Sequence, residues 1–354
     1  MVARMPTGID YLSARLHARR GQLAEGERLD ALCRLRTIPE LARALFPNTP
    51  LQSSIELQRR LVFEQVRELT DLARMIEGPA GNAIDWLCMR YRLENLKVLA
   101  RAFVTRTPFV EVRQYLVPIP GEEAYDDAAL ANADTVETFA ELLPHKAFQA
   151  GIEYVLPLFH AQPRAFILEA ALDRAYFIEL MDRTKRLGDD DREDILTLVR
   201  QDLDVFTMLL VVRGKFHYGL KNEVILPFYM AECDISYLRF GGMLASTDLA
   251  AVAAKCVGRA IDSLPPEFAG AAGTSRTLDP VVLEVLARNR SLRVANRVFR
   301  RSPMGLGVIY GYAGVRRAEL GNLITLIEGI RAGMTPEVIR RRLVPRIDLE
   351  AAHV

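Results

Sequence analysis

The chain has 354 residues, of which 50% are hydrophobic and 26% are charged, a composition typical of globular proteins. Its formal net charge of +1 argues against nucleic-acid binding, which needs an excess of basic residues. The histidines show no metal-ligand spacing, and the cysteines Cys33, Cys88, Cys233 and Cys256 show no C-x-x-C spacing, which indicates reduced core thiols in a cytosolic protein.

The N-terminal segment contains no apolar stretch, so no signal peptide is expected. The longest uncharged run, residues 302–315, is shorter than the ~20 residues that span a bilayer, and Pro303 and several glycines interrupt it. We therefore expect a soluble protein, or one that reaches a membrane through partner proteins.

Helix signals occur along the whole chain. Thr37-x-x-Glu40 and Ser53-x-x-Glu56 fit capping boxes, and Asp134-x-x-Glu137 fits the same pattern with an aspartate as the cap. The second box precedes one apolar stripe at helical spacing, formed by Val62, Val66, Leu69, Ala73 and Ile76. No run of alternating strand residues occurs, so an all-α fold is expected.

Long helices are predicted in three pairs. The pairs cover residues 55–77 with 82–104, 164–187 with 192–213, and 281–300 with 304–331. Their first helices start at residues 55, 164 and 281, which are 109 and 117 residues apart. This period is longer than a solenoid repeat and close to one small helical domain. Segments 117–127 and 214–222 are candidate linkers.

A short pattern recurs before each pair. It reads TIPELARAL at residues 37–45, TVETFAELL at 135–143 and, more faintly, TDLAAV at 247–252. The second helix of each pair repeats an acid-containing turn and a terminal arginine. We predict a mainly structural role for the residues of this repeat signature, which are Thr37, Leu41, Asn95, Arg101, Thr135, Phe139, Arg213, Leu249, Asn322 and Arg331. A helical unit that recurs three times in one chain indicates a scaffold rather than an enzyme built around a pocket.

The order of these motifs resembles the C subunit of the archaeal and bacterial V/A-type rotary ATPases, a family related to the d subunit of eukaryotic vacuolar ATPases. Three segments carry the resemblance: YLSARLHARRGQL at 11–23; YRLENLKVLARA at 91–102 with TPFVEV at 107–112; and SPMGLGV at 302–308 with ELGNL at 319–323. The second repeat departs from the pattern, because Asp204-Val205 stands where Asn-Leu is expected.

The resemblance implies three similar helical domains arranged about a pseudo-threefold axis as a funnel with a central cavity. The expected domains are residues 1–116, 117–221 and 222–354. The implied role is that of a non-catalytic central-stalk subunit, which links the rotor shaft to the membrane proteolipid ring and transmits torque for ion transport. It implies no catalytic residue, cofactor, metal, nucleic acid or small-molecule substrate. It also implies a peripheral position on the cytoplasmic face of the membrane, held through the complex.

Two groups of arginines are candidate partner contacts. Arg15, Arg19 and Arg20 lie in the first predicted helix, and Arg290, Arg293 and Arg297 share a face of the helix that starts near residue 281. The alternative is a solvated face with ion pairs inside the domain, since charge runs usually face solvent. Aromatic residues are not interleaved with these arginines, which disfavours single-stranded nucleic-acid binding.

The strongest enzymatic signal is the segment DDRED at residues 190–194, which fits the D-D-x-x-D pattern of all-helical isoprenoid synthases. Carboxylates three or four residues apart on a helix can hold Mg²⁺ and a pyrophosphate. The same residues fit an acidic first helical turn, which the helix dipole favours. A Mg²⁺-dependent synthase that uses Asp190, Asp191 and Asp194 is therefore the alternative to the non-catalytic coupling role.

Glycines at residues 305, 307 and 311 faintly match a dinucleotide-binding loop, but no strand precedes them. We expect Gly307, Gly311 and Gly314 instead to let two helices approach closely.

Overall fold

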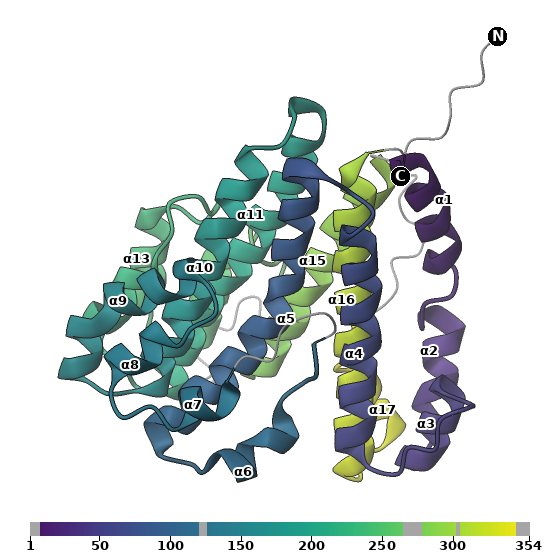
Figure 1. Cartoon of the computed structure of the whole chain (residues 1–354), viewed down its shortest axis with the longest axis horizontal. Helices are drawn as coiled ribbons and strands as arrows, with labels where there is room; N and C mark the ends of the chain where they lie inside the picture. The colour runs from purple at the N-terminus through teal and green to yellow at the C-terminus, as the bar shows by residue number, and fades with distance from the viewer. Residues whose placement is uncertain (1–7, 120–125, 265–277, 302–304, 345–354) are drawn as a thin grey trace. The chain divides into compact units, whose positions relative to one another are not determined.

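The computed structural model describes residues 8–119, 126–264, 278–301 and 305–344, and its regular elements are helices (Figure 1). Within these residues the β-type pairing is limited to one isolated bridge between Val257 and Ile261. The predicted all-α class is therefore confirmed.

The helices follow one another through the chain in this order: α1 (Gly8–Arg20), α2 (Gly26–Cys33), α3 (Ile38–Leu45), α4 (Ser54–Ala73), α5 (Gly78–Thr105), α6 (Phe109–Val112), α7 (Asp127–Ala131), α8 (Val136–Glu141), α9 (Lys146–Ala161), α10 (Ala165–Lys185), α11 (Asp189–Val211), α12 (Asn222–Ile225), α13 (Tyr237–Ala245), α14 (Leu249–Cys256), α15 (Pro280–Arg301), α16 (Leu306–Arg331) and α17 (Pro336–Arg340). Short 3₁₀ turns η1 (Arg113–Tyr115) and η3 (Leu226–Phe228) and a π-helical turn η2 (Val212–His217) complete the set.

The three predicted pairs of long helices correspond to α4 with α5, α10 with α11, and α15 with α16. Their ends agree with the predicted ends to within four residues. The expected linker from residue 214 is wrong at its start, because η2 continues the helical path of α11 to His217.

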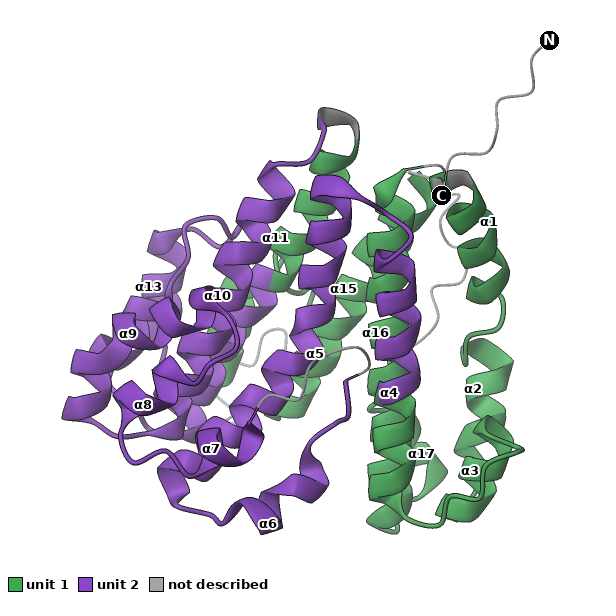
Figure 2. Ribbon diagram, viewed as in Figure 1, with its two compact units in different colours: residues 1–62, 189–202, 249–354 green, residues 63–188, 203–248 purple. Residues whose placement is uncertain are grey.

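The chain divides into two compact units (Figure 2). Unit 1 contains residues 1–62, 189–202 and 249–354, and unit 2 contains residues 63–188 and 203–248. The chain passes from one unit to the other inside α4 and again inside α11. Three domains bounded at residues 116 and 221 remain a prediction from the sequence.

Unit 1 is built on the close contact between α15 and α16. A Cβ at Gly311 would lie 2.5 Å from the backbone nitrogen of Phe299, and one at Gly314 would lie 2.7 Å from Cβ of Ala295. The predicted role of these two glycines in close packing is confirmed. Figure 1 shows α1, α2 and α3 alongside α16 and α17, and α16 is buried over much of its surface.

Unit 2 is built on α5 and α10, with α9 packed on α10 and α7 on α5. Trp86 of α5 is 1% exposed, and its indole nitrogen donates to the carbonyl oxygen of Tyr176 at 2.9 Å. The guanidinium of Arg183 lies 4.7 Å from the centre of the indole ring, over its face. These aromatic contacts fix α5 against α10 in the interior of the unit.

Two of the three predicted caps are confirmed. Glu40 N donates to Thr37 Oγ1 at 3.3 Å, and Glu56 N donates to Ser53 Oγ at 3.1 Å, each with the glutamate side chain accepting in return. The prediction of Asp134 as the cap of α8 is wrong by one residue. Thr135 is the N-cap, because its Oγ1 accepts from Thr138 N at 3.1 Å.

Candidate partner-binding surfaces

The repeated asparagines of the second long helices each hold a backbone segment 22 residues further on. Asn322 donates from Nδ2 to the Val344 carbonyl oxygen at 3.0 Å and accepts from Val344 N at 2.8 Å. Asn95 makes the same two bonds to Val117, at 2.8 and 2.9 Å. Only an amide can donate and accept in this way, so the pattern explains why asparagine occupies both positions.

In the second repeat, Asp204 stands at the corresponding position. Asp204 is 1% exposed, and its Oδ1 accepts from Ile235 N at 2.9 Å. A carboxyl group has no N–H donor, unlike the amide of asparagine. The departure noted in the sequence at this position is therefore a chemical difference as well as a difference in residue.

Three more buried polar side chains each lie three residues before Asn95, Asp204 or Asn322. They are Arg92, Gln201 and Glu319. Each reaches the short-helix region of another repeat. Arg92 donates to Asp127 at 2.7 Å, Gln201 donates to the Ala260 carbonyl oxygen at 3.4 Å, and Glu319 accepts from Ala24 N at 2.5 Å.

These contacts run from the first repeat to the second, from the second to the third, and from the third back to the first. A buried polar group must be paired, so each contact helps to fix the position of the segment that it reaches. Neither Arg92 nor Gln201 belongs to the repeat signature predicted from the sequence. One signal in the sequence would have identified Arg92 and Gln201. In each repeat a polar residue stands inside an apolar helix, one turn before the Asn or Asp position.

Two terminal arginines of the repeat signature form ion pairs with glutamates. Arg101 pairs with Glu169 at 2.8 Å, and Arg331 pairs with Glu328 at 2.6 Å. Arg213 is exposed within η2. Burial alone would raise the pKa of Glu94, but the charges of Lys97, Arg90 and Arg213 together lower it. Arg213 does not end its helix as expected, because the helical path continues to His217 and the residue with positive φ is Gly219.

The remaining signature residues lie at the short helices. Thr37 and Thr135 cap α3 and α8, while Leu41 and Phe139 are fully buried one turn later. Leu249 is half-buried and begins α14. These placements support structural roles for the threonines and for the apolar residues behind them.

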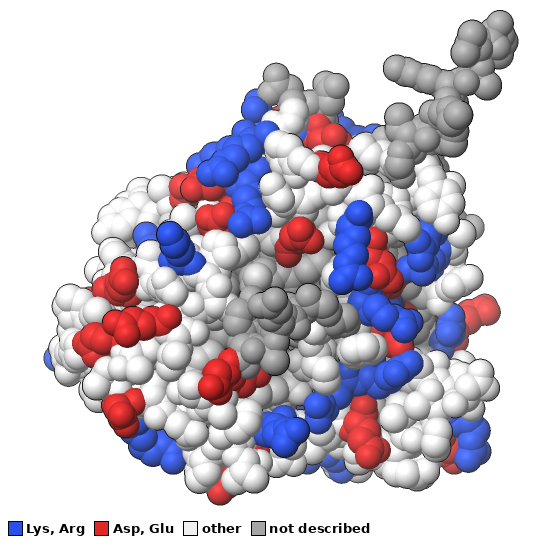
Figure 3. All heavy atoms as spheres, viewed as in Figure 1, with Lys and Arg blue, Asp and Glu red and all other residues white. Residues whose placement is uncertain are grey.

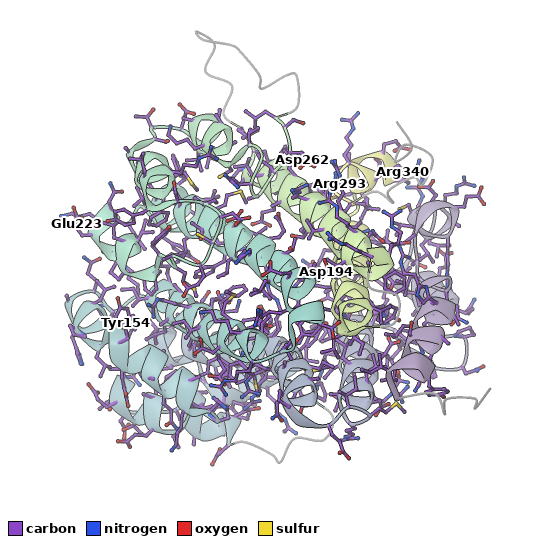
Figure 4. The ribbon with its side chains drawn as sticks, turned by 90° about the horizontal axis from the view of Figure 1, so that it is seen from above. Tyr154, Asp194, Glu223, Asp262, Arg293 and Arg340 are labelled. Carbon is purple, nitrogen blue, oxygen red and sulfur yellow. The ribbon has the colours of Figure 1, made fainter. Side chains whose placement is uncertain are left out.

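Arg290, Arg293 and Arg297 lie along one side of α15, and most of its buried residues lie on the other. Arg288 lies on the buried side and donates to the Arg342 carbonyl oxygen at 3.3 Å. Asp262 pairs with both Arg290, at 3.1 Å, and Arg293. Figure 4 shows Asp262 beside Arg293. Arg297 is exposed, and no ion pair joins it to another described residue.

The three arginines of α1 do not share one face. Arg20 pairs with Glu25 at 2.5 Å and donates to Asn296 Oδ1 of α15 at 3.0 Å. Arg15 and Arg19 are half-buried and, by the 3.6-residue period, point away from Arg20. The structure therefore brings Arg20 to the α15 arginines and leaves Arg15 and Arg19 on another side of α1.

The acidic segment at residues 190–194 lies in the first turns of α11. Asp191 accepts at Oδ1 from Leu306 N at 2.8 Å, which caps the start of α16, and Asp194 pairs with Arg301 at 3.7 Å. The side chain of Asp190 lies outside the described residues. The contacts of Asp191 and Asp194 are structural, and the synthase interpretation finds no support in them.

A partly buried ion network lies between α5 and α10 in unit 2, with Glu94 at its exposed end. Lys97 Nζ is 2.9 Å from Glu94 and 3.2 Å from Asp173. Burial alone would lower the pKa of Lys97, but the two carboxylates outweigh it and hold that pKa above its usual value. Burial raises the pKa of Asp173 in spite of Lys97. The network joins two packed helices, which explains its shifted pKa values without a catalytic role.

No cluster of three or more His, Cys, Asp and Glu side chains among the described residues is arranged to hold a metal ion. No helix in this part of the chain combines the length and apolar character that crossing a membrane requires. Acidic and basic side chains both occur over the face shown in Figure 3.

Comparison with known proteins gives a consistent result over nearly the whole chain. The family model described as ATP synthase (C/AC39) subunit matches residues 12–342. The A-type ATP synthase C subunit of Methanosphaera stadtmanae is 23% identical over 337 residues, covering 92% of this chain and 85% of the relative. The proteins of the same name from Methanothermobacter thermautotrophicus and Methanocaldococcus jannaschii are 23% and 21% identical, covering 94% of this chain and 87% and 86% of the relatives.

Proposed function

This chain belongs to the family of ATP synthase (C/AC39) subunits, and on that basis we propose that it couples the central stalk of a V/A-type rotary ATPase to the membrane proteolipid ring. It is a structural subunit of an ATP synthase and not itself an enzyme. The family match over residues 12–342 is the observation that carries this conclusion.

Transmitting torque requires a body that deforms little, and the contacts of this chain suit that requirement. Close-packed helices have few voids and low compressibility. The polar contacts of Arg92, Gln201 and Glu319 link successive repeats and return from the third to the first. Such a closed series is what a funnel of three similar domains would need, and it supports that arrangement. The complex would hold the protein peripherally, on the cytoplasmic face of the membrane.

The test is assembly and coupling in the native complex. The tagged full-length chain should co-purify from native membranes with central-stalk subunits and with the proteolipid ring. Membranes from a strain that lacks the chain should keep ATP hydrolysis by the soluble head but lose ATP-driven ion pumping. Normal pumping without the chain, or the absence of both partners from the purified material, would refute the proposal.

A further inference from the structure

A basic surface in unit 1 combines residues from α1 and from the C-terminal half of α15. We call it the arginine ridge and define it as Arg20, Arg293, Arg297 and Arg300. Arg293, Arg297 and Arg300 share one helix face by their spacing of four and three residues. One contact brings α1 beside this face, since Arg20 donates to Asn296 Oδ1 at 3.0 Å. A second contact holds α1 to the buried side of α15, where the rings of His17 and Phe299 lie 4.6 Å apart.

The charge of the ridge is compensated at two of its four arginines. Glu25 pairs with Arg20, and Asp262 pairs with Arg293. Arg300 donates to the carbonyl oxygen of Asn296 at 3.2 Å, which neutralises no charge. Among the described residues, no carboxylate pairs with Arg297 or Arg300. Two exposed guanidinium groups thus lie one turn apart with their charge unbalanced.

The unit that carries the ridge is itself basic, although the chain is almost neutral. Unit 1 contains 28 Lys and Arg against 21 Asp and Glu, a formal charge of +7, and unit 2 contains 18 against 24, a formal charge of −6. A positive field around the ridge would attract an acidic partner and orient it during approach.

The apolar side of α15 is already used in packing. Ala295 and Phe299 contact α16 at Gly314 and Gly311, which leaves mainly charge on the outer side. Helices that lie in a membrane interface instead bury their apolar face in the lipid. Guanidinium groups on a rigid helix suit the fixed, bidentate geometry of protein carboxylates, and arginine is enriched in protein interfaces.

We propose that the arginine ridge docks an acidic protein surface elsewhere in the rotary complex, with carboxylates of that partner paired to Arg297 and Arg300. This inference rests on the proposed function, because the partner is taken from the same complex. Glu25 and Asp262 hold Arg20 and Arg293 in place, and Arg297 and Arg300 supply the charge that binds the partner.

The test compares two double charge reversals in the full-length chain. The variant Arg297→Glu with Arg300→Glu changes the ridge. Arg34→Glu with Arg43→Glu is the matched control, since it makes the same change in charge at two exposed positions of the same unit, the C-cap of α2 and the last turn of α3. Binding to purified central-stalk subunits, and separately to the proteolipid ring in nanodiscs, is measured from low to moderately high salt, a range over which the Debye length falls from above ~10 Å to below it.

We expect the ridge variant to bind one of these partners at least about tenfold more weakly at low salt, with a shallower salt dependence, while the control stays within about twofold of the wild type. The melting temperatures of the two variants should agree. If the wild type binds and the ridge variant binds equally well, the inference is wrong and the proposed function stands. If the wild type binds neither partner, the proposed function fails and the inference fails with it.

Anionic lipid is the competing ligand. Sedimentation with phosphatidylglycerol vesicles measures it directly. Loss of vesicle binding in the ridge variant, with binding to the protein partners unchanged, would assign the ridge to lipid phosphates and overturn the proposal.

Discussion

The two asparagine contacts offer a controlled comparison, because their hydrogen bonds match and their surroundings differ. Asn322→Ala removes both bonds to Val344, which is 1% exposed. A net hydrogen bond contributes about 1 kcal/mol, and a buried backbone group left without a partner costs about 1–3 kcal/mol. We therefore expect Asn322→Ala to lower the free energy of unfolding by about 3 kcal/mol. Asn95→Ala should cost about 1–2 kcal/mol, because Val117 is half-buried and water can replace the lost partner.

Urea unfolding at neutral pH measures both changes. Far-UV circular dichroism follows all helices, and fluorescence follows Trp86, the single tryptophan, which lies on the same helix as Asn95. The comparison is valid where the slope of the free energy against urea is unchanged by the substitution. A cost for Asn95→Ala equal to or larger than that for Asn322→Ala would refute the assignment of the difference to burial. A cost below about 1 kcal/mol for Asn322→Ala would show that its contact does not hold the segment at Val344.

Three further predictions concern packing, capping and pH. Gly311→Ala should lower the melting temperature, because its Cβ would meet the Phe299 backbone, whereas Gly241→Ala, with open space around it, should raise the melting temperature slightly. Asp191→Ala should cost about 1 kcal/mol through the lost cap, and a stabilising effect of added Mg²⁺ on the wild type alone would contradict this reading. Hydrogen bonds from the Arg36 and Thr37 backbone and the Thr37 hydroxyl hold the pKa of Glu40 below 4.5, so the stabilisation by the Glu40 carboxylate is present above that pH and is lost as the pH falls further. The destabilisation by Glu40→Gln should therefore shrink over the same pH range. A stability difference between this variant and the wild type that stays constant from neutral pH down through the lowered pKa would refute the prediction.

Local signals explain why the helices could be predicted so well. The boxes at Thr37 and Ser53 involve residues three positions apart, so their hydrogen bonds depend only on local conformation. At Asp134 and Thr135, two adjacent side chains could both cap, and only the backbone conformation decided for Thr135. The extension of α11 into η2 was missed because Gly214 resembles a stop signal. In the structure it leaves room for Phe166 and Ile225.

The arginine groups show the limit of the same reasoning. Periodicity placed Arg290, Arg293 and Arg297 on one side of a helix, because the helical period is fixed by the backbone. It could not assign Asp262 to two of them, nor bring Arg20 to Asn296 while leaving Arg15 and Arg19 elsewhere. The Arg293 contact joins residues 31 positions apart and the Arg20 contact residues 276 positions apart, so no local pattern encodes them.

By itself, the sequence determined the helical class, the three pairs of long helices, the repeat and the resemblance to the rotary-ATPase family. All of these depend on periodicity, capping and motif order, which are properties of neighbouring residues. Only the tertiary structure decided which partner each buried polar group has, from the Asn322 contact to the cap that Asp191 provides for α16. The physical reason is that a buried hydrogen bond needs two groups in the same place, and folding alone brings distant parts of the chain together.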